Sequence, residues 1–153
     1  MTNKPRTLIL TGASRGIGHA TVRRFSEAGW RIITCSRENV PAECQLDPNW
    51  AHHVPTDLND RASVQSFIET ANGLIGEDGL SALVNNAAVS PKTPYNERLG
   101  CLNGDEYAWR AVFELNFFVP LALCRGFGAA LHRGKGAVVN ITSIAGHISH
   151  PFA

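Results

Sequence analysis

The chain has 153 residues, which is enough for one domain with a buried core. With 44% hydrophobic and 18% charged residues and a formal net charge of +1, it gives no electrostatic reason to expect nucleic acid or a membrane surface as a partner. The four cysteines lack CxxC spacing and no apolar run approaches the ~20 residues of a membrane span, so we expect a cytoplasmic protein without a disulfide framework or a zinc site.

Short apolar runs alternate with amphipathic segments, which is the pattern of strands and helices around a parallel sheet. The runs predict strands at residues 7–11, 31–36, 52–55, 80–85 and 137–142. Helical periodicity predicts helices over about 18–28 and 61–75 and from Asp105 toward His132. Residues 38–49 and 91–104 contain prolines and lack a period, so we expect loops there. The pattern predicts an α/β fold in a single domain, residues 1–153.

The segment Thr11-Gly-Ala-Ser-Arg-Gly-Ile-Gly18 joins the first strand to the first helix. Its three glycines allow a tight turn, a close approach of backbone to phosphate, and close packing of helix on strand. The unpaired N–H groups at the start of such a helix can bind a diphosphate. The spacing is GxxxGxG, which differs from the GxGxxG of many dinucleotide sites, so a plain tight turn is the alternative.

Two further polar motifs stand at the ends of strands. Asn85-Asn-Ala-Ala88 follows the fourth strand, and Val138-Val-Asn-Ile-Thr-Ser143 spans the end of the fifth. In open parallel sheets, ligands bind beyond the carboxyl ends of the strands, near the point where the strand order switches. The three motifs together therefore predict a ligand site at this edge.

In these motifs the chain resembles the short-chain dehydrogenase/reductase family. The matching residues, in the family's order, are Thr11–Gly18, Asp57 in Thr-Asp-Leu, Asn85–Ala88, Asn116 and Ser143. One departure is Ala88, where the family usually has glycine, and we expect the motif's structural role to survive this change. The resemblance implies a Rossmann-type doubly wound parallel sheet with strand order 3-2-1-4-5, lacking the later strands of the full family fold.

The resemblance also implies the contacts to a nicotinamide cofactor. Asp57 holds the adenine amino group in the family, and the backbone of Asn85–Ala87 lines the ribose side. Taken alone, Asp57 is also an ordinary turn residue at a helix entry. The cofactor-binding residues that we expect are Gly12, Ser14, Arg15, Gly16, Ile17, Gly18, Ser36, Arg37, Asp57, Leu58, Asn85, Asn86 and Ala87.

The end of the second strand favours NADP(H) over NAD(H). NAD-binding members place a carboxylate there to bind the ribose 2′-OH, whereas this chain has Ser36 followed by Arg37. A serine and a guanidinium can bind a 2′-phosphate through charge-assisted hydrogen bonds, and Arg15 in the glycine turn is a second candidate. The alternative is that Arg37 is a solvated loop cation beside Glu38.

The resemblance assigns two catalytic residues, Ser143 and Asn116. The hydroxyl of Ser143 matches the family's serine, which binds the substrate oxygen. Asn116 precedes Pro120 by four residues, and because proline has no N–H, a kink there would leave the carbonyl of Asn116 free for a water. A tolerated kink without a catalytic role is the alternative.

The family's Tyr-x-x-x-Lys pair does not occur in these 153 residues. The tyrosines are Tyr95 and Tyr107, and the residues four positions later are Leu99 and Ala111. We therefore expect part of a longer oxidoreductase that transfers hydride between the cofactor and a small carbonyl or alcohol substrate, with no turnover by these residues alone. The other hypothesis is a non-catalytic dinucleotide-binding or oligomerisation module.

Partners and metals are less well indicated. The helix from Asp105 carries more apolar positions than one core face needs, and family members often pair through it, so we expect a homo-oligomer, a dimer or tetramer.

His52 and His53 are adjacent on a strand and point to opposite faces, which is wrong for chelation, so we expect no metal site.

Overall fold

The computed structural model describes residues 4–39, 47–90, 92–93, 95–97, 99–100 and 103–144. Its five strands form one parallel sheet in the order β3-β2-β1-β4-β5. The strands are β1 (Thr7–Thr11), β2 (Arg31–Ser36), β3 (His52–Pro55), β4 (Ala82–Asn85) and β5 (Ala137–Asn140). The predicted Rossmann-type topology is confirmed, and its switch in strand order lies between β1 and β4.

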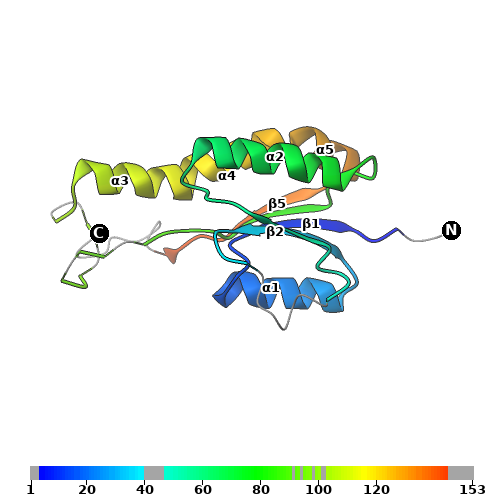
Figure 1. Ribbon diagram of the computed structural model, residues 1–153, viewed down its shortest axis with the longest axis horizontal. Helices are drawn as coiled ribbons and strands as arrows, with labels where there is room; N and C mark the ends of the chain where they lie inside the picture. The colour runs from blue at the N-terminus through cyan, green and yellow to red at the C-terminus, as the bar shows by residue number, and fades with distance from the viewer. Residues whose placement is uncertain are drawn as a thin grey trace.

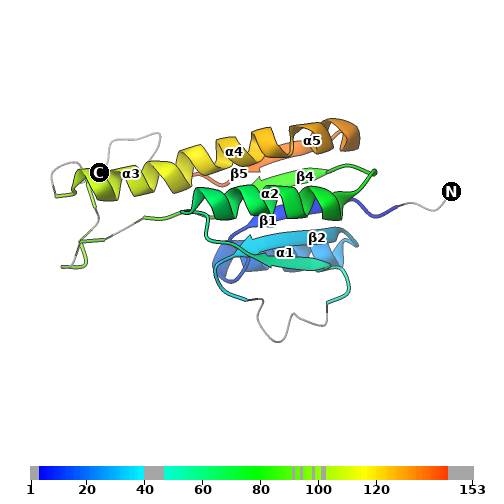
Figure 2. The ribbon, with the colours of Figure 1, turned by 45° about the horizontal axis from the view of Figure 1, so that its top comes forward.

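Helices cover both faces of the sheet. They are α1 (Gly16–Glu27), α2 (Arg61–Ile75), α3 (Glu106–Phe113), the π-helical turn η2 (Glu114–Phe118), α4 (Val119–Gly126) and α5 (Gly128–Gly134). Figure 1 shows α1 on one face and α2, α4 and α5 on the other. In Figure 2, α2 and α4 lie side by side and α3 extends beyond the sheet.

The core has two layers, one on each side of β1. All five residues of β1 are buried because helices cover both faces of the sheet. Successive side chains of a strand point to opposite faces. Leu8 and Leu10 therefore pack in one cluster with Val22 of α1, and Ile9 packs in the other with Phe67 of α2. This arrangement fixes β1 in the middle of the molecule, with its carboxyl end next to the start of α1.

The helix predicted from Asp105 toward His132, with a possible kink at Pro120, is present but interrupted twice. In η2, just before Pro120, the pairing is π-helical, and the N–H of Val119 donates to the carbonyl of Glu114. A sharper break follows at Phe127, where the helix axis turns by 58°. Glycines on both sides of Phe127 weaken the helix, and the fully buried Phe127 ring packs edge-on against Phe67 with 5.9 Å between ring centroids.

The ends of two strands also differ from the prediction. β4 begins at Ala82, two residues late, because the N–H of Leu80 donates to the carbonyl of Ala130 in α5 at 2.8 Å instead of joining the sheet. β5 ends at Asn140, although the N–H of Ile141 still donates to Asn85 at 2.9 Å.

β5 is exposed. All four of its residues are exposed, and Val138 and Val139 are 41% and 46% accessible. It is the last strand of the sheet, so in the part of the chain that the structure describes only the edge facing β4 is paired.

Within the described residues no single helix has the length and hydropathy to cross a bilayer, and only the bent pair 106–126 and 128–134 passes that test when its two parts are taken together.

Candidate cofactor-binding site

The turn from β1 into α1 has a backbone that only glycine adopts easily. Gly12 has φ +70° and Gly16 has φ +59°, both in the left-handed region. The N–H of Gly12 donates to the carbonyl of Cys35 in β2 at 2.8 Å, which fixes the start of the turn to the neighbouring strand. The turn is therefore held to the sheet at one end and enters α1 at the other.

The first turn of α1 presents donors without a side-chain cap. Arg15 is the N-cap residue and makes no capping hydrogen bond through its side chain, and no acidic residue lies in the first turn. The first N–H groups of a helix have no partner within the helix and carry a partial positive charge. Residues Arg15, Gly16 and Ile17 are exposed, so this end of α1 is suited to an anion such as a diphosphate.

Gly18 allows α1 to pack closely against the turn. A Cβ atom at Gly18 would lie 2.1 Å from the carbonyl oxygen of Gly12 and 2.6 Å from Nδ2 of Asn86. A Cβ atom at Gly12 would lie 3.0 Å from Cα of Ala87. The glycine turn and the Asn85–Ala88 motif are thus in direct contact, although about 70 residues separate them in the sequence.

Hydrogen bonds from Thr11 and Asn86 join the same two segments. The hydroxyl oxygen of Thr11 accepts from the N–H of Asn86 at 3.1 Å and from that of Ala87 at 3.0 Å. In return, Nδ2 of Asn86 donates to the carbonyls of Thr11 at 2.9 Å and Gly12 at 3.1 Å. Thr11 is not among the predicted cofactor contacts, although it begins the glycine motif. The Asn86 side chain lies against the backbone of the turn and shapes the wall of the site.

Asn85 links β4 to β5. Its side chain is buried, and Nδ2 donates to Oδ1 of Asn140 at 2.8 Å. The two residues are also partners in the strand register. Asn140 lies in the Val-Val-Asn-Ile-Thr-Ser motif, so this amide pair connects two of the three strand-end motifs. It also fixes the end of β5, from which the chain continues to Ser143, against the end of β4.

Asp57 stands two residues beyond the end of β3. Its Oδ1 accepts from the backbone N–H of Asn59 at 3.0 Å and from Nδ2 of Asn59 at 3.2 Å, while its own N–H donates to Oγ of Ser63 at 3.1 Å. Asp57 is exposed and Leu58 is buried. Asp57 thus forms the turn into α2 and keeps its carboxylate at the surface of this edge. Asp60 caps α2 through the N–H groups of Ala62 and Ser63.

At the end of β2, Ser36 and Arg37 differ in exposure. Ser36 is buried and its hydroxyl donates to the carbonyl of Glu38 at 2.6 Å. Arg37 is exposed. The cationic group available at this strand end is therefore the guanidinium of Arg37, whereas the hydroxyl proton of Ser36 is engaged by the backbone.

Asn116 holds the chain that follows the Asn85–Ala88 motif. Its Oδ1 accepts from the N–H of Val89 at 2.9 Å, and its Nδ2 donates to the carbonyl of Val89 at 2.8 Å. Both bonds come from η2, so the π-helical turn places this amide opposite the segment after β4. Ser143 is exposed three residues beyond the end of β5.

The structure therefore brings the sequence-predicted residues to one edge in two ways. Gly12 lies against Gly18, Asn86 and Ala87. The remaining polar positions are at the same edge because each follows the carboxyl end of its own parallel strand: Arg37 after β2, Asp57 after β3 and Ser143 after β5.

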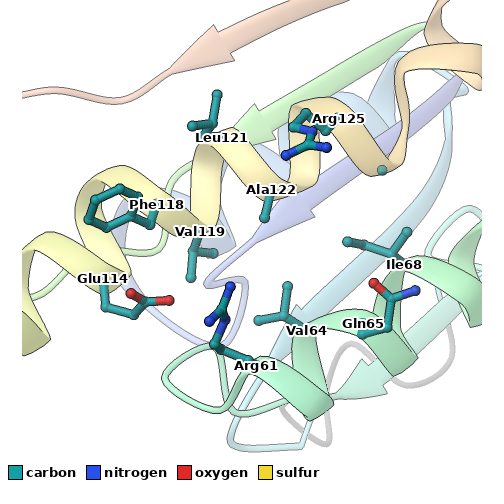
Figure 3. Close-up of a pocket in the computed structure, with 11 residues that line it drawn as sticks. Arg61, Val64, Gln65, Ile68, Glu114, Phe118, Val119, Leu121, Ala122 and Arg125 are labelled. Atoms are coloured by element: carbon teal, nitrogen blue, oxygen red, sulfur yellow. The ribbon is translucent and has the colours of Figure 1, made fainter.

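A separate groove lies between α2 and the η2–α4 segment. It has a volume of about 710 Å³ and is drawn in Figure 3. Arg61, Arg125 and Glu114 are among the side chains that line it, together with apolar residues such as Phe118 and Leu121. None of the residues expected to bind the cofactor lines this groove.

The chain is similar to known oxidoreductases over nearly its whole length. Residues 6–153 match the family model described as short chain dehydrogenase. Protein FixR of Bradyrhizobium diazoefficiens is 44% identical over 98% of this chain and 54% of its own length. Cis-4-hydroxycyclohexanecarboxylate dehydrogenase of Sinomonas cyclohexanicum is 34% identical over 94% and 57%. The chain spans about half the length of these relatives.

A solved structure is similar in fold and in sequence. It is an oxidoreductase of the short chain dehydrogenase/reductase family from Brucella ovis, in complex with a partially ordered NAD. The TM-score is 0.88 at 45% identity, and the match covers 98% of this chain and 68% of that one.

Proposed function

The chain belongs to the short-chain dehydrogenase family, and we propose that residues 1–153 form the dinucleotide-binding domain of an oxidoreductase. When bound, a nicotinamide cofactor supplies or accepts the hydride, and the substrate is a small carbonyl compound or alcohol. The oxidoreductase class rests on the family and on the dehydrogenases among the relatives.

The observation that carries the proposal is the start of α1, which has no side-chain cap and packs closely on the turn through Gly18 and Gly12. The N–H groups there have no side-chain acceptor, and the close packing of Gly18 on Gly12 keeps the backbone free of side chains. This surface fits a diphosphate, which accepts hydrogen bonds and carries the complementary charge. The NAD complex of the similar Brucella ovis protein supports a nicotinamide dinucleotide as the source of that diphosphate.

The remaining contacts are carried over from the family resemblance to residues at the strand ends. Asp57 binds the adenine amino group, and Asn85–Ala87 line the ribose side through their backbone. The proposed cofactor contacts are Gly12, Ser14, Arg15, Gly16, Ile17, Gly18, Ser36, Arg37, Asp57, Leu58, Asn85, Asn86 and Ala87.

NADP(H) is the preferred dinucleotide in this proposal. The exposed Arg37 at the end of β2 and Arg15 in the glycine turn provide positive charge for a 2′-phosphate, and no carboxylate stands at position 36 to repel it. Glu38 is exposed next to Arg37 and weakens this field.

The binding preference is tested by substitution of Arg37. Dissociation constants of NADPH and NADH are measured for the full-length protein and for Arg37→Ala. We expect the substitution to weaken NADPH by roughly tenfold and NADH by little, because only NADPH loses a charge-assisted hydrogen bond. Arg23→Ala, which removes an exposed arginine from the body of α1, is the matched control. Tighter binding of NADH than of NADPH by the unsubstituted protein overturns the preference.

Two catalytic roles belong to the same proposal. The hydroxyl of Ser143 binds the substrate oxygen, and Asn116 holds a water for proton transfer through its backbone carbonyl. Pro120 has no N–H to donate to the Asn116 carbonyl, and the Asn116 side chain binds Val89. Tyr95 and Tyr107 are both highly exposed, and neither is four residues before a lysine, so neither matches the family's Tyr-x-x-x-Lys pair. In this proposal the proton donor lies outside residues 1–153.

We expect residues 1–153 expressed alone to show no reductase turnover. The test follows NADPH oxidation with a panel of ketones, and the full-length protein is the positive control. Any substrate-dependent oxidation by the isolated 153 residues contradicts this part of the proposal.

The protein is a homo-oligomer in the cytoplasm in this proposal. Aromatic and aliphatic side chains are exposed along η2 and its neighbours, including Phe113, Phe117, Phe118 and Leu121, more than one core-facing stripe requires. The same surface supports the second candidate, a non-catalytic oligomerisation module. The free thiols of Cys35 and Cys124 suit a reducing compartment. Sedimentation of the full-length protein tests the assembly, and a monomer contradicts it.

A further inference from the structure

His53 of β3 contacts three groups of β2 and of the turn that follows it. Its Nδ1 lies 2.8 Å from Oγ1 of Thr34, which is its partner in the strand register. Its Nε2 lies 2.9 Å from the carbonyl oxygen of Glu38 and 3.3 Å from Oγ of Ser36. One side chain of an edge strand thus reaches both the body of β2 and the turn that carries Arg37.

The partners of His53 fix which ring nitrogen carries the proton. The Glu38 carbonyl can only accept, so Nε2 donates to it. The indole N–H of Trp50 donates to Oγ1 of Thr34 at 2.7 Å, which leaves the hydroxyl proton of Thr34 to donate to Nδ1 of His53. All of these bonds are made at once by a neutral ring protonated on Nε2. Burial lowers the pKa of His53, which favours the same neutral form.

The Glu38 carbonyl is held from two sides. It accepts from Nε2 of His53 at 2.9 Å and from the hydroxyl of Ser36 at 2.6 Å, which uses both of its lone pairs. On the other side of Arg37, the Ser36 carbonyl accepts from the N–H of Thr56 at 2.9 Å. The backbone on both sides of Arg37 is therefore fixed, and this exposed residue has only its side chain free to move.

We infer that His53 is a positioning residue for the adenosine end of the cofactor. By holding the Glu38 carbonyl it sets the direction in which Arg37 leaves the sheet, and so sets the preference between a dinucleotide with a 2′-phosphate and one without. The inference rests on the proposed function. It adds to the proposed cofactor contact of Ser36 a second role, in which the Ser36 hydroxyl donates its proton to the Glu38 carbonyl and builds the turn together with His53.

Two substitutions distinguish the hydrogen bond made by Nδ1 of His53 from the one made by Nε2. In His53→Gln the side-chain amide reaches the place of Nε2 and still donates to Glu38. In His53→Asn the shorter amide occupies the place of Nδ1, so Thr34 keeps a partner and Glu38 loses its donor. We expect the ratio of the NADH and NADPH dissociation constants to fall roughly fivefold in His53→Asn, which is the effect of one lost hydrogen bond, and to be rescued in His53→Gln.

The measurement is made by titration of each cofactor into the full-length protein, with thermal unfolding of each variant alongside. Absence of binding of either dinucleotide by the unsubstituted protein defeats the proposed function before any variant is compared. If the unsubstituted protein prefers NADPH and His53→Asn keeps the same ratio, or if both variants lose the ratio equally, the positioning role is wrong and the cofactor assignment stands.

A readout without any substitution uses the ring itself. The ¹⁵N chemical shifts of the His53 imidazole distinguish the two neutral tautomers. We expect the proton on Nε2 in the absence of cofactor, and a proton on Nδ1 would overturn the inference because Glu38 would then lack its donor.

Discussion

Replacing Gly18 by alanine tests the close contact between α1 and the glycine turn. The added methyl group would stand 2.1 Å from the carbonyl oxygen of Gly12, 2.9 Å from its carbonyl carbon and 2.6 Å from Nδ2 of Asn86. Two of these atoms belong to the backbone of Gly12 and cannot move aside as the end of a flexible side chain could. The helix and the turn must separate, and Asn86 must leave its bonds to Thr11 and Gly12.

The size of the effect follows from that separation. Cβ atoms almost never approach a neighbour closer than 3.0 Å, so the Gly12 carbonyl has to move by about 0.9 Å. Overpacking of this kind costs about 1–3 kcal/mol of folding stability. The same movement displaces the first N–H groups of α1 from the diphosphate, and we expect cofactor affinity to fall by at least roughly tenfold, since 1.4 kcal/mol is a factor of ten.

The assay combines thermal unfolding with cofactor titration of the full-length protein. Gly73→Ala is the matched control, because Gly73 lies inside α2 and a Cβ there has nothing within 4 Å. Alanine is the better helix former, so this control should gain about 0.5–1 kcal/mol and bind cofactor unchanged. Unchanged melting temperature and affinity in Gly18→Ala would refute the reasoning, as would equal behaviour of the two variants.

Three further predictions concern single side chains. Thr11→Val removes the acceptor of the Asn86 and Ala87 N–H groups and should cost about 2 kcal/mol in urea unfolding, whereas Thr11→Ser should retain most of that stability. Asp60→Ala removes the cap of α2 and should cost about 1 kcal/mol, with Asp60→Asn close to the original. Because burial lowers the pKa of His53, the unfolded chain binds this proton at a higher pH than the folded protein does. The contribution of His53 to stability should therefore be constant above about pH 6.5 and fall as the pH drops below it. A stability difference between the original protein and His53→Gln that is independent of pH would contradict this last prediction.

The sequence predicted the sheet well because its strands are defined locally. Thr7–Thr11 and Arg31–Ser36 are short apolar runs bounded by turn residues, and their observed bounds match the predicted ones. The helix Arg61–Ile75 also matches, since Asp60 caps it and its apolar residues recur on one face. In each case the information lies within the segment itself.

The sequence predicted that the site positions gather at the carboxyl edge of the sheet, but it did not predict the contacts among them. The roles of the Thr11 hydroxyl and the Asn86 amide depend on two segments meeting across the sheet, which no local pattern records. The contact of Asn116 with Val89 depends in the same way on the π-helical turn. The only local indication of the contact between the Thr11 hydroxyl and the Asn86 segment was the position of a threonine directly before the glycine turn.

The network around His53 was missed for a related reason. Adjacent residues of a strand point to opposite faces, which argues against metal chelation by His52 and His53 but does not identify their hydrogen-bond partners. The same alternation places His53 on one face with Thr34 and Ser36, but only the register between β2 and β3 shows that they are neighbours. The break at Phe127 depends likewise on a distant partner, the ring of Phe67.

The exposed outer strand has a practical consequence for anyone who prepares these residues. The sequence of β5, Ala-Val-Val-Asn, contains no charge and no proline, the groups with which natural sheets discourage strand addition. With that strand uncovered, copies of residues 1–153 should associate edge to edge as their concentration rises, with a growing β signal in infrared spectra. A lysine introduced at Val139 should keep them apart without disturbing Gly12 or Asn86.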